Sequence, residues 1–236
     1  MSSKPIITSL ALHTDFYQLS MAYAYWKAKI DMKQACFHLF FRRPPFHGGF
    51  TIAAGLENVV QLIETFRFEP DDLAYLATIR HSNNSRYFDD SFLEMLSKLH
   101  LDVSVHAIPE GTAVFPYEPI LRVVGPLMQC QLLESALLNL INFPTLIATK
   151  AARICLAADG DTVLEFGLRR AQGIDGALTA SRAAFIGGCS VTSNVMAGKA
   201  FGIPVQGTQA HSWIMAFDQE KAAFETYADV LPDACV

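Results

Sequence analysis

The chain has 236 residues, of which 51% are hydrophobic and 17% are charged, so it can bury a substantial core and is not mainly disordered. Its net charge of -5 at pH 7 gives no general attraction to nucleic acid or to an anionic membrane, and any anion site must therefore be local. The N-terminus shows no secretory signal and no segment approaches a membrane span, so we expect a cytoplasmic protein without a membrane or nucleic-acid partner.

The first part of the chain is typical of a scaffold of helices and short strands. Thr14 and the sequence DFYQLSMAYAYWKAK predict a capped helix, and Asp15 and Tyr17 lie in its first turn, where a side chain either packs or extends towards a ligand. The run QACFHLFF predicts a strand, and RRPPFHGGF predicts a turn whose Arg42 and Arg43 could bind phosphate or remain solvated. Further helices are predicted at 53–68, 71–80 and 90–99, and short strands at 101–127.

The second part of the chain changes in pattern. The stretch 129–158 predicts a long helix, interrupted near Pro144, whose apolar residues on nearly every side indicate a buried helix or an oligomer interface. After Gly160, short strands and helices alternate and end in ACV, the start of a further strand, which is the pattern of a parallel sheet or barrel. We therefore predict an α/β protein, with a mixed α+β domain at 1–128 and the long helix plus the first βα units of such a barrel at 129–236.

Polar side chains gather at or just past the ends of three predicted strands. These clusters are Glu165 with Arg169 and Arg170, then Ser190 to Asn194, then Thr208 to Ser212. Because the carboxyl ends of parallel strands lie on one face of such a fold, we expect the clusters to converge. The planar guanidinium groups of Arg169 and Arg170 suit phosphate or carboxylate, although an internal salt bridge to Glu165 or Asp175 would also explain them.

The remaining polar residues carry weaker signals. Glycines on both sides of Asp175 allow close approach of the backbone to a ligand, but they are also typical of an ordinary turn. Residues 190–194 could orient an anion at a helix N-terminus, although helix capping explains one or two of them. Histidine changes its charge near neutral pH, so His211 could shuttle protons or act as a nucleophile. The five widely spaced cysteines contain no C-x-x-C pair, and we predict no disulfide framework and no protein-bound metal.

Four long motifs follow one another along the chain: TDFYQLSMAYAYW, FFRRPPFHGGF, PEGTAVFPYEPILRVVGPL and LEFGLRRAQGIDGALTASRAAFIGGCSVTSNVMAGKAFGIPVQGTQAHSW. In this order they resemble nicotinate phosphoribosyltransferase, and the likeness covers nearly the whole chain. The resemblance implies a mixed N-terminal domain joined to part of an irregular α/β barrel of the type II phosphoribosyltransferase kind. It also implies a homodimer with the active site at the subunit interface.

The resemblance further implies a reaction, in which a 5-phosphoribosyl group passes from phosphoribosyl pyrophosphate to the ring nitrogen of nicotinate. The products would be nicotinate mononucleotide, an intermediate of NAD biosynthesis, and pyrophosphate, with coupled hydrolysis of ATP and Mg²⁺ as the ion. His211 matches the histidine that ATP phosphorylates in the family, while Tyr17, from its own or the neighbouring subunit, and Thr208 would contact nicotinate. Contacts with phosphate, carboxylate or other substrate groups are implied for Arg169, Arg170, Asp175 and Ser212.

The family sequence continues past the point that corresponds to Val236, through the rest of the barrel. A further nicotinate-binding arginine and the loops that hold the ribosyl phosphate would lie in that continuation, so we expect the chain of 236 residues to be inactive alone. Two alternatives stay open. One is a related enzyme that uses nicotinamide or quinolinate, or another phosphate-handling barrel enzyme. The other is a truncated product that retains only dimerisation or regulatory binding.

Overall fold

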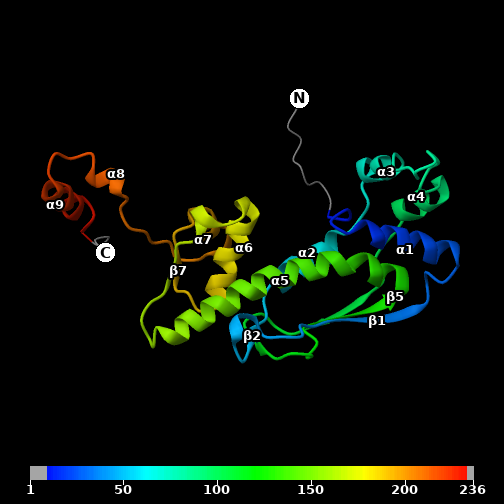
Figure 1. Ribbon diagram of the computed structural model, residues 1–236, viewed down its shortest axis with the longest axis horizontal. Coiled ribbons are helices and arrows are strands. Elements are labelled where there is room, and N and C mark those ends of the chain that lie inside the picture. Colours follow the sequence, from blue (N-terminus) through cyan, green and yellow to red (C-terminus); the bar gives the residue numbers. More distant parts are fainter. Residues whose placement is uncertain (1–9, 233–236) are drawn as a thin grey trace. The chain divides into compact units, whose positions relative to one another are not determined.

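The chain forms two compact units, Met1–Thr149 and Lys150–Val236, in a computed structural model that describes residues 10–232. We call them the first and the second unit (Figure 1). Their division lies inside the long helix α5, Leu127–Ala157, and not at the start of that helix, where the sequence places the boundary. The boundary lies later in the chain than predicted because the first part of α5 supplies many buried side chains to the core of the first unit.

An antiparallel sheet of three strands is the framework of the first unit. Its order is β1 (Gln34–Leu39), β5 (Leu121–Pro126) and β3 (Ser104–Ala107). Successive side chains of a strand point to opposite faces, and here Leu39, Leu121 and Val123 are buried while the neighbouring Arg122 is exposed. Figure 1 shows α5 lying along this sheet. The alternation of β1 and β5 therefore directs one face of the sheet into the core.

Four shorter helices, one 3-10 turn and two very short strands complete the described part of the first unit. They are α1 (Phe16–Lys27), the 3-10 turn η1 (Pro45–His47), β2 (Thr51–Ile52), α2 (Leu56–Thr65), α3 (Pro70–Leu76), α4 (Asp90–Ser97) and β4 (Ala113–Val114), which pairs with β2. Aromatic rings join α1 to α4, because Tyr23 and Trp26 lie 4.9 and 5.5 Å from the ring of Phe92. Phe92 is fully buried, and the partly buried rings of Tyr23 and Trp26 pack against the core beside it.

Helix α1 begins without the threonine cap that the sequence predicts. Asp15 is the N-cap residue, and its side chain makes no capping bond. Its Oδ2 atom accepts a hydrogen bond of 2.6 Å from Ser135 Oγ on α5. Thr14 Oγ1 is buried and has no hydrogen-bond partner among the described residues. The carboxylate of Asp15 therefore makes a tertiary contact with α5 and no capping bond to α1.

Helix α5 runs without a break through Pro144, whereas the sequence predicts an interruption there. Proline has no N–H, so the carbonyl of Leu140, four residues earlier, loses its usual helical hydrogen bond. Gly55 packs against this carbonyl so closely that a Cβ added to Gly55 would lie 2.1 Å from the oxygen. One turn after the proline, Thr149 Oγ1 accepts a hydrogen bond of 2.9 Å from Ile52 N. Close packing against β2 and the start of α2 thus accommodates the proline within the helix.

By length and composition, α5 is apolar enough to cross a membrane, with a mean hydropathy of 1.3 over 18 residues. This finding corrects the expectation that no segment approaches a membrane span. Half of that window, 50%, is buried inside the structure, and the core helices of folded domains often have the same composition. Burial in the structure therefore accounts for the buried half of this apolar window.

Asp89 connects α4 to α1. It is the N-cap residue of α4, where Oδ1 accepts a hydrogen bond of 2.9 Å from Phe92 N. Its Oδ2 accepts a hydrogen bond of 3.0 Å from Tyr23 OH and forms an ion pair with Lys27 Nζ. The hydrogen bond from Lys27 is the main reason why the pKa of Asp89 lies far below its ordinary value. The carboxylate therefore stays ionised in the folded protein under mildly acidic conditions.

We expect Asp89→Ala to lower the free energy of unfolding of the first unit by about 1–2 kcal/mol at pH 7, the usual cost of losing an N-cap. Asp89→Asn keeps a cap oxygen and should cost less. Because the folded pKa is depressed, the ionised side chain contributes fully above the unfolded pKa of about 4, and its contribution is lost as the pH falls further. Urea unfolding at pH 7 and at about pH 3 tests this sign, since the gap between wild type and Asp89→Asn must narrow in acid.

The second unit alternates short strands with helices after the last turns of α5. Its elements are β6 (Leu164–Glu165), η2 (Leu168–Arg170), α6 (Gly173–Ile186), β7 (Val191–Thr192), α7 (Val195–Phe201), α8 (His211–Ile214) and α9 (Glu220–Val230). Strands β6 and β7 pair in parallel, and Val205 adds a parallel bridge to Thr192. These parallel segments confirm the predicted α/β class. The strand expected at ACV, the last three residues, lies outside the described residues.

Candidate active site

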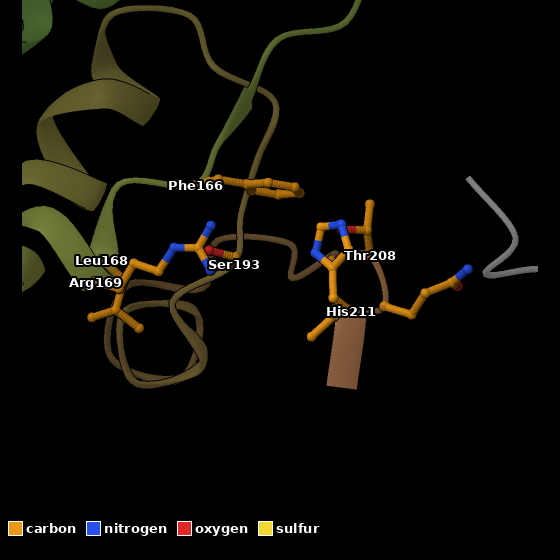
Figure 2. Close-up of a pocket in the computed structure, with 9 residues that line it drawn as sticks. Phe166, Leu168, Arg169, Ser193, Thr208 and His211 are labelled. Atoms are coloured by element: carbon orange, nitrogen blue, oxygen red, sulfur yellow. The ribbon is translucent and has the colours of Figure 1, made fainter. Parts of the chain in front are cut away.

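A cleft of about 400 Å³ lies where the parallel segments of the second unit end. Its lining residues are Phe166, Leu168, Arg169, Ser193 and 207–211. Figure 2 shows the side chains of Arg169 and His211 extending towards one opening from opposite sides, with the ring of Phe166 beside them. The three clusters that follow the parallel segments therefore each contribute to one site, as expected for the carboxyl ends of parallel strands.

The carboxylate of Glu165 fixes the backbone of the segment that carries Arg169. Its Oε1 accepts a hydrogen bond of 2.5 Å from Gly167 N. Its Oε2 accepts hydrogen bonds of 2.6 Å from Thr192 Oγ1 and 2.9 Å from Ser181 Oγ. These bonds join β6, α6 and β7. The salt bridge to the paired arginines, which was the alternative explanation for them, is not formed among residues 10–232.

The cluster of polar residues at 190–194 divides between the cleft and the interior. Ser193 lines the cleft, whereas Thr192 and Asn194 are 0% and 3% exposed. Asn194 caps α7, because its side-chain oxygen accepts a hydrogen bond of 3.2 Å from Ala197 N. Helix capping therefore accounts for Asn194, and only Ser193 of this cluster is placed to meet a ligand in the cleft.

His211 is the first residue of α8, a short helix that α9 holds in place. Trp213 Nε1 donates a hydrogen bond of 3.1 Å to Ala223 O, and its ring lies 5.0 and 5.7 Å from those of Phe217 and Tyr227. The side chain of His211 is exposed and makes no hydrogen bond within the described part of the chain. Its backbone is thus anchored, while its imidazole is open to a substrate.

The predicted site residues fall into three groups. Three of them line the cleft: Arg169, Thr208 and His211. Three others are exposed in the second unit without lining it: Arg170, Asp175 and Ser212. The seventh residue, Tyr17, belongs to the first unit. The two arginines differ because successive side chains of a 3-10 helix point about 120° apart. Their functional roles, and those of the other residues, stay predictions.

Tyr17 lies where hydrogen bonds connect polar side chains of α1 and α5. Its hydroxyl accepts a hydrogen bond of 3.0 Å from Gln18 Nε2 and donates one of 3.4 Å to Glu134 Oε1. Gln18 is fully buried and bonds in turn to the side chain of Gln131. Tyr17 itself is 49% exposed. The phenol is therefore held at its hydroxyl while much of its ring remains open to a ligand.

Sequence reasoning missed two apolar residues of the cleft, Phe166 and Leu168. They are 41% and 44% exposed, although both are large and apolar. The signal that was available is the position of Phe166, which follows directly after a strand whose end carries the clustered polar residues. An aromatic ring in such a place offers a flat apolar face to a planar ligand.

The residues of the cleft limit the chemistry that it can perform. No group of three or more His, Cys, Asp or Glu side chains placed to hold a metal ion occurs among residues 10–232, and the lining of the cleft contains no carboxylate. Burial, assisted by the nearby Cys155, raises the pKa of Cys189 to about 12, so this thiol stays protonated and unreactive. The side-chain groups that the cleft offers are thus a guanidinium, an imidazole, a carboxamide, hydroxyls and an aromatic ring.

A mixed α+β unit, followed by parallel βα units with a cationic and aromatic cleft at the strand ends, defines an α/β protein whose cleft has the chemistry for a small anionic or planar ligand. Solved structures with the same fold include human nicotinic acid phosphoribosyltransferase, with 46% identity and a TM-score of 0.78 over 86% of this chain and 40% of that one. A nicotinate-nucleotide pyrophosphorylase from Pyrococcus furiosus has 26% identity and a TM-score of 0.75, over 98% of this chain and 51% of that one.

Sequence comparison identifies the family. The nicotinate phosphoribosyltransferase (NAPRTase) N-terminal domain matches residues 12–142. The nicotinate phosphoribosyltransferase of Bacillus subtilis is 49% identical over 228 residues, which cover 97% of this chain and 45% of the relative. The chain therefore belongs to the nicotinate phosphoribosyltransferase N-terminal domain family, and it spans slightly less than half the length of the Bacillus relative.

Proposed function

We propose that the chain is the N-terminal part of a nicotinate phosphoribosyltransferase, which makes nicotinate mononucleotide and pyrophosphate from nicotinate and phosphoribosyl pyrophosphate. The observation that carries this proposal is the cleft at the strand ends, which joins Arg169, Thr208 and His211 in a chain of this family. In the reaction, the ring nitrogen of nicotinate forms a bond to the ribosyl carbon as the bond from that carbon to pyrophosphate breaks. The enzyme must therefore hold the nitrogen in line and stabilise the charge that departs.

The lining of the cleft offers groups that suit some parts of these substrates. Arg169 has a planar guanidinium that suits a phosphate or the carboxylate of nicotinate. Phe166 presents an exposed aromatic face against which a pyridine ring can stack. Thr208 supplies a hydroxyl beside them. In our proposal Tyr17 contacts nicotinate in the active site of a homodimer, and its half-exposed ring supports that role.

Our proposal includes coupling to ATP, with His211 as the group that receives a phosphoryl group. An exposed imidazole without an internal partner can attack the terminal phosphorus of ATP, which releases ADP. Mg²⁺ would enter as the ion bound by the substrate phosphates, because the described residues form no cluster that suits it and the cleft has no carboxylate. No step of the proposal therefore depends on a metal held by this chain.

The test requires a protein that contains the rest of the barrel. If the reading frame continues past Val236, the longer product serves; if it stops there, the chain is joined to the C-terminal half of the Bacillus subtilis relative. We call either protein the completed enzyme. It should convert nicotinate and phosphoribosyl pyrophosphate to nicotinate mononucleotide, and much less efficiently use nicotinamide or quinolinate. Preference for nicotinamide or quinolinate would replace this proposal by the related-enzyme alternative.

The chain alone provides a second measurement. We expect no formation of nicotinate mononucleotide by the purified 236-residue protein, because it spans 45% of the Bacillus relative and ends before the rest of the barrel. Measurable turnover by the chain alone would contradict this expectation. If the completed enzyme is also inactive with all three bases while the chain forms a stable dimer, the alternative of a binding or dimerisation product is favoured.

A further inference from the structure

Cys36 and His38 form a pair on the outer face of strand β1 in the first unit. Both side chains are exposed, because they alternate along the strand with Phe37 and Leu39, which face the core. Residues two apart in a strand are separated by roughly 6.6–6.8 Å along the chain. The Sγ atom of Cys36 nevertheless lies only 3.6 Å from Nε2 of His38. The two side chains therefore lean towards each other, and the function proposed for the cleft uses neither of them.

The separation of these two atoms matches that of two ligands on one zinc ion. Zinc bonds a cysteine sulfur at about 2.3 Å and a histidine nitrogen at about 2.0–2.1 Å, and its protein sites are mostly tetrahedral. At those lengths and the tetrahedral angle, the sulfur and the nitrogen lie about 3.5–3.6 Å apart. The observed distance also fits a weak hydrogen bond between the thiol and the imidazole, and a cation that replaces the thiol proton then meets both ligand atoms.

Solvent and ions can reach this pair. His38 lines a cavity of about 330 Å³ together with Arg122 and His106, the residues that follow it in register across β5 and β3. Within residues 10–232, no third His, Cys, Asp or Glu side chain joins Cys36 and His38 in a group that could hold a metal ion. Water would therefore occupy the other positions of a tetrahedral ion. Arg122 places a positive charge beside His38, which lowers the affinity for a cation.

We propose that Cys36 and His38 bind a thiophilic divalent cation, with Zn²⁺ as the representative ion. Thiolate and imidazole favour such an ion, whereas Mg²⁺ and Ca²⁺ take oxygen ligands. The thiol proton passes to solvent as the bond from sulfur to the ion forms. The expectation of no protein-bound metal rested on the missing C-x-x-C pattern, which a Cys-x-His pair on one face of a strand does not require. The proposal concerns the first unit and does not rest on the function proposed for the cleft.

The experiment titrates the full chain, reduced and treated with a chelator, first with Co²⁺ and then with Zn²⁺ as competitor. Co²⁺ should produce the absorption of a cobalt–thiolate bond, Zn²⁺ should remove it, and Mg²⁺ should not. We expect a Kd for Zn²⁺ of roughly 1–200 µM, because two protein ligands supply about half the binding free energy of a structural site with four. Absence of the cobalt–thiolate absorption, or binding of Zn²⁺ only in the millimolar range, would overturn the proposal.

Substitutions on the strand locate the ion. Cys36→Ser and His38→Gln should each weaken binding of Zn²⁺ at least about tenfold, since even outer-shell partners of a metal ligand contribute about 10–100-fold. Cys36→Ser should also remove the cobalt–thiolate absorption. The matched controls are His106→Gln, at the other histidine that lines the cavity, and Cys155→Ser, at a thiol of the second unit. Both controls should bind as the wild type does, and a loss in either control as large as that in Cys36→Ser would place the ion elsewhere and overturn the proposal.

Arg122→Gln tests the sign of the ligand's charge. Glutamine removes the positive charge opposite His38, so binding of Zn²⁺ should tighten a few-fold at low ionic strength. Added salt should reduce this gain, because both side chains are exposed and their interaction is screened. Weaker binding of Zn²⁺ in Arg122→Gln at low ionic strength would show that the ion depends on the arginine, as an anionic complex would, and it would overturn the proposal.

Discussion

His211→Ala should abolish the stimulation of nicotinate mononucleotide formation by ATP in the completed enzyme, while some ATP-independent transfer remains. The reason is that, in our proposal, the exposed imidazole receives the phosphoryl group, whereas the proposed substrate-binding residues Arg169 and Thr208 are unchanged in the variant. Initial rates with and without ATP, at saturating nicotinate and phosphoribosyl pyrophosphate, measure the effect. Wild type should also acquire an acid-labile phosphoryl group from ATP, and the variant should not.

The matched control is His100→Ala, at an exposed histidine of the first unit. It should retain both the stimulation by ATP and the phosphoryl group. His211→Gln adds a second control, because it keeps a polar side chain at the start of α8 but cannot carry the phosphoryl group in the same way. Unchanged ATP stimulation in His211→Ala would reject the role that we give to His211. Phosphorylation of His211→Ala as well as His100→Ala would place the modified residue elsewhere.

Most of the fold could be predicted because its elements follow local patterns. The alternation of buried and exposed residues in β1 and β5 and the βα rhythm of the second unit are both visible in the sequence. The errors arose where a distant contact decided the outcome. Asp15, and not Thr14, is the N-cap residue of α1, and its carboxylate bonds to Ser135 of α5, while α5 continues through Pro144 with Gly55 packed against the freed carbonyl. Neither contact can be inferred from the residues next to it in sequence.

The candidate site was partly predictable for a related reason. Parallel strand ends had to converge, and Arg169, Thr208 and His211 do line one cleft. Which member of a local cluster faces the cleft depends on side-chain direction, and the sequence does not contain that information directly. Thr192 turns inward to Glu165, whereas Ser193, one residue later, lines the cleft. The spacing of the polar residues therefore predicted where the site lies in the fold, but it did not predict which residues line it.

Glu165→Ala should destabilise the second unit. It removes an acceptor of hydrogen bonds from Thr192 Oγ1, Ser181 Oγ and Gly167 N, although the Ser181 hydroxyl keeps a second acceptor in the carbonyl oxygen of Ala177. Hydrogen bonds to charged groups contribute about 1.5–3 kcal/mol each, and losses within one network are not additive, so we expect a loss of roughly 3 kcal/mol in the free energy of unfolding. Hydrogen exchange of the amides of β6 and β7 and urea unfolding measure it.

The same change should also affect the cleft, because the carboxylate holds the turn at Gly167 between Phe166 and Arg169. In the completed enzyme, Glu165→Ala should therefore raise the KM for the substrates under conditions where the variant is still folded. The matched control is Glu225→Gln on α9, whose exposed carboxylate pairs only loosely with Lys221 at 3.4 Å and should change stability by a few tenths of a kcal/mol at most. A loss in Glu225→Gln as large as that in Glu165→Ala would show that net charge, and not the network, is responsible.

Glu165→Gln distinguishes the charge of the carboxylate from its shape. The amide has one oxygen, which can accept either from Gly167 N or from the two hydroxyls, but not from both sides at once. If its oxygen faces Gly167 N, the turn beside Arg169 is retained. The NH₂ group then has to donate its hydrogen bonds to the hydroxyl oxygens of Ser181 and Thr192, which already accept hydrogen bonds from Asn194. We therefore expect an intermediate loss of stability with a nearly normal KM, and a KM as high as that of Glu165→Ala would mean that the turn depends on the negative charge itself.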